Sequence, residues 1–279
     1  MRFCKMNGAG NDFIILNNMV KKLPHDILPE VARTLCHRHL SIGADGLMVV
    51  EKPEQGGDYR MLFYNSDGSA GEMCGNGARC ICRYGYEMGL AGETQTVESP
   101  SGIVTGQRID ARNYRIRLTD PSVIRLEDTL ETAHGQYPCA YVELGGPGLP
   151  HAAVPYPGLK DMTMDEMRQL GKELRWHKVF PKGANVNFYD IVGEDEIVEL
   201  TYERGVEDFT YACGTGTGSV VLALTLLGKV SGDDVRVSVP GGLLKVTIER
   251  DGSDIKGIYL TGPTNIVCHG EVTDEDLKV

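Results

Sequence analysis

The chain has no long apolar run and no run of basic residues. A membrane-spanning helix needs about 20 consecutive apolar residues, and none of the apolar stretches approaches that length. The opening residues, MRFCKMNGAGNDFIIL, lack the separate basic and apolar regions of a signal peptide. Acidic residues outnumber basic ones by 39 to 28, which disfavours nucleic acid or a membrane surface as a partner. We therefore expect a cytoplasmic protein that binds a small polar metabolite.

Cysteine is too sparse for a disulfide scaffold, with eight in 279 residues. In a reducing compartment most of them should be thiols that pack as small apolar residues. The spacings in CGNGARCIC match no common zinc pattern, and His37 and His39 lie on a predicted helix without a partner motif. We expect no bound metal. We assign no function to Cys4, Cys36, Cys80, Cys82, Cys139 and Cys268.

Two cysteine-glycine motifs stand half a chain apart. EMCGNGARC (72–80) and YACGTGTGS (211–219) place Cys74 and Cys213 at an offset of 139 positions. Three more pairs of segments match in the same order, at offsets of 138, 140 and 142: FYNSDGS with TYERGVE, VESPSGIVT with VSVPGGLLK, and RLTDP with YLTGP. Four collinear matches at a nearly constant offset indicate an internal duplication, with a unit far longer than a solenoid repeat.

Each half has the same predicted layout. Stretches such as RFCKM, DYRMLFYN, AYVEL and EIVELTYE are typical of strands, and PSG and PGG of the turns between them. A helix follows each cysteine and ends near Gly89 or Gly228, and a second helix is expected in 26–40 and 163–174. We predict an α+β fold of two pseudo-symmetric domains. They comprise residues 1–122, with 264–279 as a candidate addition, and residues 123–263.

The position of each cysteine suggests its chemistry. It stands just before glycines that open a helix, so the sulfur and the first free N–H groups should face the same space. Such a site favours an anion, and it lowers the pKa of a cysteine from about 8.5 toward neutrality. If a pseudo-twofold axis relates the halves, Cys74 and Cys213 face one another across one cleft. An amino-acid racemase needs this arrangement, because one thiolate removes the α-proton and the opposite thiol returns one.

The proton transfer itself is difficult. An α-proton is less acidic than a thiol by roughly ten pKa units, which at 1.36 kcal/mol per unit makes the transfer uphill by about 14 kcal/mol. Two helix N-termini aimed at the substrate carboxylate, in a site closed to water, would lower this barrier. The duplicated motif would supply both helices.

Four alternatives compete with this interpretation. A single cysteine before a glycine-rich turn is more often structural, although two at matched positions reverse that expectation. The run CGTGTGS is similar to a phosphate loop but lacks the Gly-Lys-Ser/Thr ending. A thiol redox protein would use facing cysteines without needing the glycines, and an amino-acid-binding module would need the glycines without both sulfurs.

The segments MNGAGNDF, FYNSDGSAGEMCGNGAR, NVNFY, YERG and ACGTGTG, in this order, closely resemble the diaminopimelate epimerase family. The resemblance implies two domains, each a mixed or antiparallel sheet wrapped around a central helix, with the active site in the cleft between them. It also implies a cytoplasmic homodimer without pyridoxal phosphate or another cofactor, acting in lysine and peptidoglycan biosynthesis.

Carried over by position, the resemblance implies a set of site residues. The catalytic pair is Cys74 and Cys213. The implied substrate-binding residues are Asn11, Asn65, Gly75, Asn76, Asn185, Glu203, Arg204, Gly214 and Thr215. Backbone groups of Gly75, Asn76, Gly214 and Thr215, which follow the two cysteines, would hold the α-carboxylate. The planar guanidinium of Arg204 suits a distal carboxylate. For Asn65 and Asn185, the alternative to substrate binding is turn formation. For Arg204 it is an ion pair on the solvated surface.

Two departures from the family pattern touch the implied substrate site. Leu149, in GGPGLPH, stands where the family has an asparagine. The loop GVEDFTYA (205–212) is one residue longer than usual, so that Glu207 and Asp208 share the place of one carboxylate. Phe209 and Tyr211 add aromatic bulk beside the second thiol.

These departures favour a racemase of another amino acid, such as histidine, as the alternative function. Arg204 and Asn185, which the chain retains, favour diaminopimelate.

Overall fold

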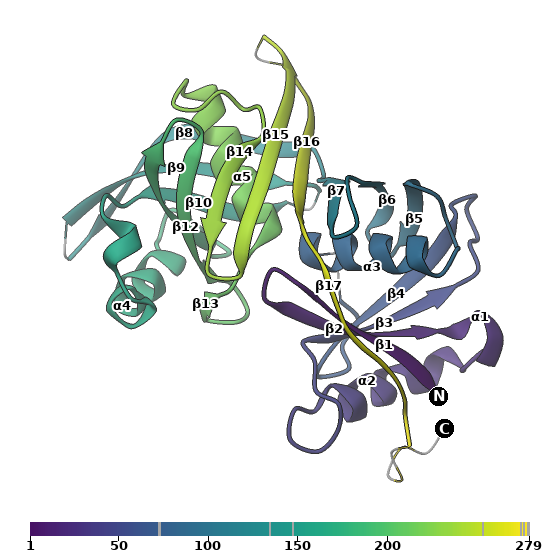
Figure 1. The fold of residues 1–279 in the computed structure, drawn as a ribbon. Coiled ribbons are helices and arrows are strands. Elements are labelled where there is room, and N and C mark those ends of the chain that lie inside the picture. Colours follow the sequence, from purple (N-terminus) through teal and green to yellow (C-terminus); the bar gives the residue numbers. More distant parts are fainter. Residues whose placement is uncertain are drawn as a thin grey trace. The chain divides into compact units, whose positions relative to one another are not determined.

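The computed structural model describes residues 1–71, 74–133, 135–146, 148–252, 254–273, 275 and 277. By internal contacts the chain divides into two compact units (Figure 1). Unit 1 comprises Met1–Ile116 and Gly262–Val279, and unit 2 comprises Arg117–Thr261. None of the described helices combines the length and the apolar character needed to cross a membrane.

Unit 1 contains eight of the described strands and three α-helices. The strands are β1 (Arg2–Gly8), β2 (Asn11–Asn17), β3 (Gly46–Glu51), β4 (Tyr59–Asn65), β5 (Thr94–Ser99), β6 (Gly102–Arg108), β7 (Asn113–Arg117, at the boundary) and β17 (Asn265–Glu271). The helices are α1 (Asn18–Lys21), α2 (Leu28–Cys36), which follows the short 3₁₀ turn η1 (His25–Ile27), and α3 (Gly75–Glu87). The pairs β2–β3 and β4–β5 are parallel, whereas β17–β1, β1–β2, β3–β4, β5–β6 and β6–β7 are antiparallel.

Unit 2 repeats this scheme. Its strands are β8 (Pro121–Thr132), β9 (Gly135–Leu144), β10 (Leu149–Pro155), β11 (Asn185–Gly193), β12 (Glu196–Glu203), β13 (Asp208–Thr210), β14 (Val235–Val239), β15 (Gly242–Asp251) and β16 (Asp254–Pro263, at the boundary). Its helices are α4 (Met164–Arg175), preceded by the 3₁₀ turn η2 (Leu159–Asp161), and α5 (Gly214–Leu226). Here β10–β11 and β12–β14 are the parallel pairs, and β8–β9, β9–β10, β11–β12, β14–β15 and β15–β16 are antiparallel.

The two units correspond in most of their elements, except that α1 and β13 have no counterpart. In each, a parallel pair of strands flanks an outer helix, α2 or α4, and a second parallel pair flanks the helix that follows a cysteine, α3 or α5. The topology therefore repeats, as the four sequence matches predicted. A parallel pair requires a crossover connection, and in both units the helices provide it.

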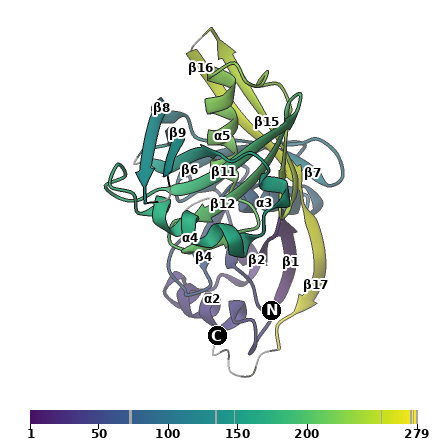
Figure 2. The ribbon, with the colours of Figure 1, turned by 90° about the vertical axis from the view of Figure 1, so that its left-hand side faces the viewer.

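Each cysteine-linked helix is the centre of its unit. Helix α3 contacts β1 and β2 on one side and β6 on the other (Figure 1). Helix α5 contacts β9, β10, β11 and β15, and Figures 1 and 2 both show it enclosed by strands. Eleven of its residues are buried, because GSVVLAL is apolar on every side. The predicted α+β fold, with a sheet wrapped around a central helix in each half, is confirmed.

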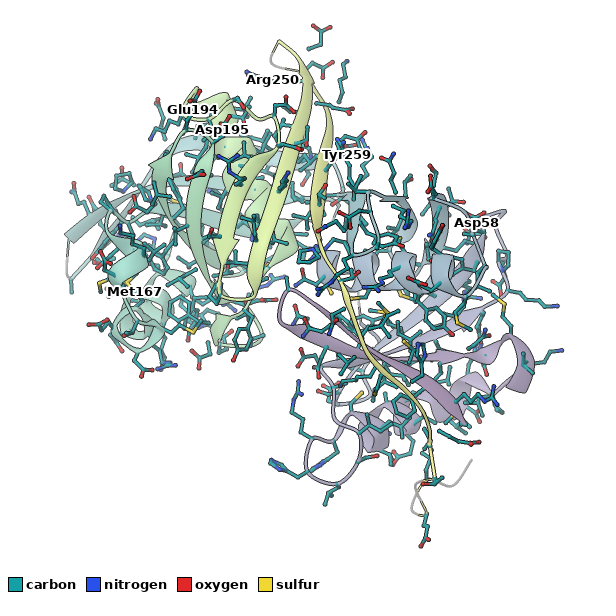
Figure 3. All side chains as sticks on the ribbon, viewed as in Figure 1. Asp58, Met167, Glu194, Asp195, Arg250 and Tyr259 are labelled. Carbon is teal, nitrogen blue, oxygen red and sulfur yellow. The ribbon has the colours of Figure 1, made fainter. Side chains whose placement is uncertain are left out.

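The outer helices cover the opposite face of each sheet. In unit 1, Leu28 and Leu35 of α2 pack in one core with Ile14 and Leu16 of β2. In unit 2, Met167 of α4, labelled in Figure 3, is 1% exposed and packs in the core that lies against β11.

The predicted capping box of α4 is present. Thr163 Oγ1 accepts the Glu166 N–H at 3.3 Å, and Glu166 accepts the Thr163 N–H at 2.7 Å.

One helix prediction was wrong at its C-terminal end. Helix α2 stops at Cys36, so His37 and His39 lie outside it. The Nδ1 atom of His37 accepts the backbone N–H groups of His39 and Leu40 at 3.3 and 3.1 Å, which ties the chain into a turn. The backbone of His37 is extended, and the helix therefore ends there.

Candidate active site

Cys74 is the N-cap of α3. Its Sγ accepts the backbone N–H of Gly77 at 3.2 Å, and its side chain is half-buried. A Cβ at position 77 would lie 2.6 Å from Met48 Cε and 3.2 Å from the sulfur, so a side chain there would have to displace the end of Met48. Glu72 and Met73, the first residues of this motif, lie outside the described residues. The sulfur thus accepts one of the N–H groups that have no carbonyl partner at the start of α3.

A buried arginine lies behind this turn. Arg79 is fully buried and donates to Asn76 Oδ1 at 2.8 Å and to Gly75 O at 3.2 Å. Burial lowers the pKa of Arg79 to about 10, while the nearby thiols of Cys80 and Cys74 raise it, so the guanidinium stays charged at neutral pH. Within the described part of the chain, no carboxylate forms an ion pair with it. A positive charge is therefore buried beside the first cysteine.

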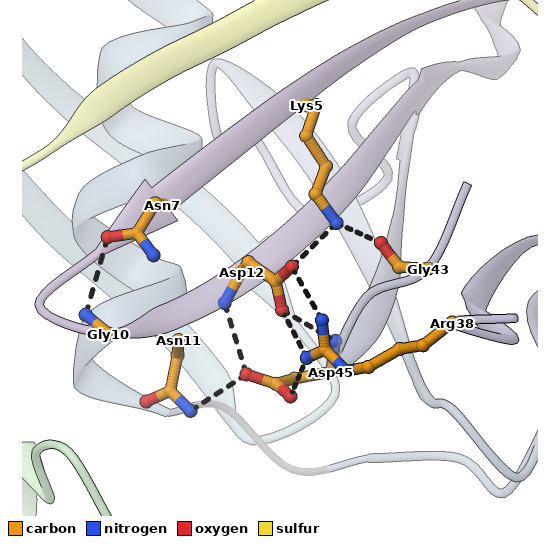
Figure 4. A network of polar contacts seen from close by, with 8 residues as sticks. All are labelled: Lys5, Asn7, Gly10, Asn11, Asp12, Arg38, Gly43 and Asp45. Atoms are coloured by element: carbon orange, nitrogen blue, oxygen red, sulfur yellow. Dashed lines mark hydrogen bonds and ion pairs between the residues drawn. The ribbon is translucent and has the colours of Figure 1, made fainter.

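Asn76 and Asn11 join α3 to the β1–β2 turn. Asn76 is 2% exposed and donates to Asn11 Oδ1 at 2.5 Å. Asn11 in turn donates to Asp45 Oδ2 at 3.2 Å (Figure 4). Both ends of the Asn11 amide are thus held by protein groups. Asn11 thereby contacts the first turn of α3.

An ionic network supports Asn11 from behind (Figure 4). Asp12 pairs with Lys5 at 2.7 Å and with Arg38 at 2.7 Å, and Arg38 also pairs with Asp45 at 2.6 Å. Burial acts to raise the pKa of Asp12, but hydrogen bonds from Arg38 and Lys5 outweigh it and hold the pKa at about 2. Lys5 also donates to the Gly43 carbonyl. The network fixes the β2–β3 edge on which Asn11 lies.

Asn65 lies in a tight turn at the end of β4. Its side chain is exposed and donates to Ser69 Oγ at 2.9 Å, and its backbone N–H donates to Ser69 O at 2.9 Å. These are the turn contacts that the sequence offered as the alternative for this residue.

Cys213 is the N-cap of α5, at the position equivalent to Cys74. It is 8% exposed, and its Sγ lies 3.6 Å from Thr215 Oγ1. Burial raises the pKa of Cys213 well above its ordinary value, and the carboxylates of Glu203 and Glu199 raise it further. The expectation that the helix N-terminus lowers this pKa was wrong, because burial and two carboxylates outweigh the helix end. Cys213 is a thiol at neutral pH.

Asn185 holds the chain at Arg204. Its Oδ1 accepts the Arg204 backbone N–H at 2.8 Å, and its Nδ2 donates to the Pro150 carbonyl at 3.0 Å. The guanidinium of Arg204 forms no ion pair with a carboxylate of the described residues, and burial raises the pKa of Glu203 beside it. The side chain of Asn185 therefore supports the strand end, whereas the guanidinium has no partner charge in the described parts of the protein.

Leu149, the departure at GGPGLPH, opens β10. Its side chain is half-buried, and it pairs with Leu144 across the β9–β10 ladder. Pro147, in the same segment, lies outside the described residues.

The lengthened loop folds back on β12 as the short strand β13. Glu207 pairs with Arg175 at 3.0 Å, and Asp208 pairs with Arg168 at 2.9 Å. Both arginines belong to α4, so the extra length places two carboxylates against the outer helix of unit 2.

The two aromatic residues of this loop differ in exposure. The ring of Phe209 lies 5.4 Å from that of Tyr202 and 6.2 Å from that of Phe188, in the core of unit 2. Tyr211 is 60% exposed. Phe209 thus packs within its own unit, whereas the side chain of Tyr211 is largely exposed to solvent.

His151 is a site residue that the sequence interpretation missed. It is 1% exposed, its Nε2 lies 3.0 Å from Thr215 Oγ1, and its Nδ1 lies 3.1 Å from Asn187 Oδ1. Burial lowers the pKa of His151 to about 4, so it is neutral at physiological pH. The available signal was polar residues at core positions of apolar strands, in PHAAV, NVNFY and EIVELTY.

The family model described as diaminopimelate epimerase matches residues 3–123 and 146–267, most of the chain. The chain belongs to the diaminopimelate epimerase family. It is 35% identical to the diaminopimelate epimerase of Aquifex aeolicus over 287 aligned positions, which cover both chains completely. The diaminopimelate epimerase of Chlorobaculum tepidum is 36% identical over 270 positions, covering 96% of this chain and 100% of the relative. The family is one of isomerases, and this chain is an isomerase of the epimerase type.

Solved structures share the fold at low sequence identity. A probable proline racemase from Agrobacterium radiobacter K84 has a TM-score of 0.70 at 18% identity and covers 98% of this chain and 92% of its own. A predicted epimerase from Pseudomonas aeruginosa has a TM-score of 0.67 at 13% identity, with coverages of 98% and 99%. The two-unit α+β architecture is thus common to these proteins.

Proposed function

We propose that this protein interconverts LL- and meso-diaminopimelate by moving the α-proton between Cys74 and Cys213, without a cofactor. The observation that carries the proposal is the equivalence of these two cysteines. Each is the N-cap of the central helix of its unit, 139 positions apart in a duplicated chain. Family membership supports diaminopimelate as the substrate. The mechanism requires the two sulfurs to reach opposite faces of one α-carbon.

The surroundings of the two sulfurs suggest different resting roles. Cys74 accepts an N–H and lies near the buried charge of Arg79, which suits a thiolate base. Cys213 is buried near two carboxylates, which suits a thiol acid. In one direction the Cys74 thiolate takes the α-proton and the Cys213 S–H delivers its proton to the opposite face. The proton count balances, and the reverse reaction exchanges the two roles.

The α-carboxylate needs donors that strengthen as the proton leaves. The first backbone N–H groups of a helix have no carbonyl partner inside it, and they carry the positive end of the helix dipole. We assign the α-carboxylate to backbone groups of Gly75 and Asn76 in α3 and of Gly214 and Thr215 in α5. Donors of this kind, held in place before the reaction, are worth about 3 kcal/mol each in related oxyanion sites.

The distal end of diaminopimelate carries an amine and a carboxylate. We assign the carboxylate to Arg204, whose guanidinium has no counter-ion among the described residues, and the amine to Glu203. Asn11, Asn65 and Asn185 complete the proposed site, the last by holding the backbone of Arg204. Leu149 favours a second candidate, a racemase of an amino acid without a distal carboxylate, because it is apolar where the family has an amide.

Isotope exchange tests the function. Reduced protein is incubated in D2O with LL-diaminopimelate, with histidine and with other amino acids, and deuterium at Cα is followed by mass spectrometry. Exchange with diaminopimelate alone is expected. Exchange only with another amino acid would replace the proposed substrate, and none at all would leave a thiol redox protein as the better explanation.

Cysteine variants test the mechanism. Cys74→Ala and Cys213→Ala should each abolish full turnover, whereas Cys268→Ala, at an exposed cysteine outside the helix N-termini, should retain it. Near-normal turnover in either of the first two variants would refute the two-base mechanism. Mild oxidant should inactivate reversibly by joining Cys74 to Cys213, which peptide mapping detects. If mapping finds neither cysteine in a disulfide in inactivated protein, the two sulfurs do not meet.

We also propose that the protein is a cytoplasmic homodimer, from the family resemblance and the prevalence of symmetric dimers. Sedimentation equilibrium should give twice the chain mass of 30.5 kDa.

A further inference from the structure

A continuous chain of buried polar side chains runs from Glu199 to Cys213. Glu199 accepts from Asn187 Nδ2 at 3.0 Å, and Asn187 Oδ1 lies 3.1 Å from His151 Nδ1. His151 Nε2 lies 3.0 Å from Thr215 Oγ1, which is 3.6 Å from the sulfur. Glu199 has no exposed surface. Strands β10, β11 and β12 and helix α5 each contribute to this chain.

The direction of the hydrogen bonds is decided at Glu199, because an ionised carboxylate only accepts, and a carboxyl protonated on Oε2 still accepts at Oε1. Its other oxygen accepts from Thr217 Oγ1 at 2.6 Å. The second amide hydrogen of Asn187 goes to Thr201 Oγ1 at 2.8 Å. Turning the Asn187 amide over would set its oxygen against the carboxylate and leave two acceptors facing each other. Asn187 therefore presents its oxygen to His151.

Each later step follows from the one before. Asn187 Oδ1 only accepts, so Nδ1 of the neutral His151 carries the proton and donates it. Nε2 then has a lone pair and accepts from the Thr215 hydroxyl. With its hydrogen used in this way, the Thr215 oxygen accepts from the Cys213 S–H. The chain of bonds ends at a sulfur that keeps its proton.

We propose that Glu199 is a positioning residue that holds Cys213 as a thiol, the proton donor, in the free protein. It acts through Asn187, His151 and Thr215. The inference rests on the proposed function in taking Cys213 as one of the two acid–base groups, and it adds the device that keeps this group protonated before substrate binds.

Among the residues that the structure describes, the first half of the chain lacks this device. The positions equivalent to Glu199 and Thr217, at offsets of 138 and 139, are Met61 and Ala78. Both are buried and apolar. The duplicated units therefore differ in the polar residues behind their cysteines.

Close packing holds the chain against α5. A Cβ at Gly216 would lie 2.1 Å from Asn187 Nδ2, so the helix N-terminus presses directly on the amide. Only glycine leaves room for Asn187 at this position. The amide is thereby kept within reach of both Glu199 and His151.

The tautomer of His151 is the first test, and it needs no substrate. Long-range proton–nitrogen NMR on ¹⁵N-histidine protein should show the Nδ1–H form, with the signal assigned by its loss in His151→Gln. Glu199→Gln retains an acceptor for Asn187 and should keep this tautomer. Glu199→Leu removes the acceptor, lets the amide turn over and should give the Nε2–H form. An Nε2–H tautomer in the unaltered protein, or an unchanged one in Glu199→Leu, would overturn the proposal.

Thiol reactivity is the second test. In a background of Cys74→Ser and Cys268→Ser, alkylation of Cys213 is followed against pH by peptide mass spectrometry. Glu199→Leu should react about tenfold faster at pH 8, as a midpoint lower by about one pH unit implies. Glu199→Gln, which loses the charge but keeps the bond direction, should lie between this variant and the background protein. Thr215→Val breaks the hydrogen-bonded link between His151 and Cys213. Adding Glu199→Leu to Thr215→Val should therefore change the alkylation rate no more than Glu199→Gln changes it in the background protein, because only the effect of the charge remains.

The outcomes separate this inference from the proposed function. Equal midpoints in the background protein and Glu199→Leu would overturn the role of Glu199, whatever the substrate. Should Glu199→Leu fail to fold, the tautomer of His151 in the unaltered protein still decides whether the chain of bonds runs as proposed. A substrate other than diaminopimelate would alter the D2O experiment and leave these measurements on the free protein unchanged.

Discussion

Replacing Glu199 by glutamine should make the protein more stable above neutral pH. The carboxyl group is fully buried, and burial raises its pKa from 4.5 to about 7, against the effect of hydrogen bonds from Thr217, Asn187 and Thr201. Glutamine has nearly the same shape and never ionises. The variant therefore removes the charge and retains most of the packing.

The sign and size follow from proton binding. Below pH 4.5 the carboxyl is protonated in the folded and the unfolded chain, and the group contributes no pH dependence. Between pH 4.5 and about 7 only the folded state holds the proton, so the free energy of unfolding falls as the pH rises. About 2.5 units at 1.36 kcal/mol per unit give a loss of about 3 kcal/mol, complete above pH 7. Glu199→Gln avoids this loss.

At low pH the two proteins should be similar, because glutamine resembles a protonated glutamate. At low pH the hydrogen bond between residue 199 and Thr217 should be weaker in the glutamine variant, which lowers its free energy of unfolding by about 1 kcal/mol. At pH 8 the variant should then be more stable by about 2 kcal/mol. All other titrating groups are shared, so they cancel in the difference.

The assay is urea unfolding at several pH values from 4.5 to 9, under reducing conditions, with the midpoint and slope fitted at each pH. Glu127→Gln, at an exposed position on β8, is the matched control and should change the free energy of unfolding by less than about 0.5 kcal/mol throughout. If the difference between Glu199→Gln and the unaltered protein does not change with pH, the carboxyl does not carry a raised pKa, and the reasoning fails.

Three further outcomes follow from the same geometry. Gly216→Ala should destabilise the protein by about 1 to 3 kcal/mol in urea unfolding and reduce turnover, because its Cβ meets Asn187 at 2.1 Å; wild-type stability would contradict the packing. Thr217→Val should lower stability by about 1 to 3 kcal/mol at pH 8 and by less at pH 5, where Glu199 is protonated, and an equal loss at both would contradict the ionic bond. Arg204→Lys should raise KM for diaminopimelate about tenfold or more through loss of the paired donors, and an unchanged KM would remove Arg204 from the distal site.

Much of the fold was predictable because it depends on local patterns. The helices after each cysteine, the capping box at Thr163 and the repeated layout all follow from short-range spacing and from self-similarity. The end of α2 was not, because it depends on how the ring of His37 folds back on the chain. The long hairpin of β8 and β9 was only partly anticipated, since its outer strand exposes alternate residues and has a weak apolar pattern.

The candidate site likewise combines features that local motifs predict and features that depend on packing. The motif sequences pointed to Cys74 and Cys213 as helix caps, and both positions are caps in the structure. The carboxylates of the lengthened loop had no predictable partners, because Glu207 and Asp208 pair with arginines of α4 more than 30 positions away. Ion pairs of this kind depend on which helix packs beside the loop.

The sequence by itself determined the duplication, the placement of a cysteine at the start of each central helix and the family. Only the tertiary structure decided the protonation of the second sulfur, because burial and the nearness of Glu199 arise when β10, β11 and β12 align beside α5. His151 and Asn187 are 36 positions apart, and Asn187 and Glu199 are 12 apart. Their contacts depend on strand register, which non-local packing sets and which no short motif records.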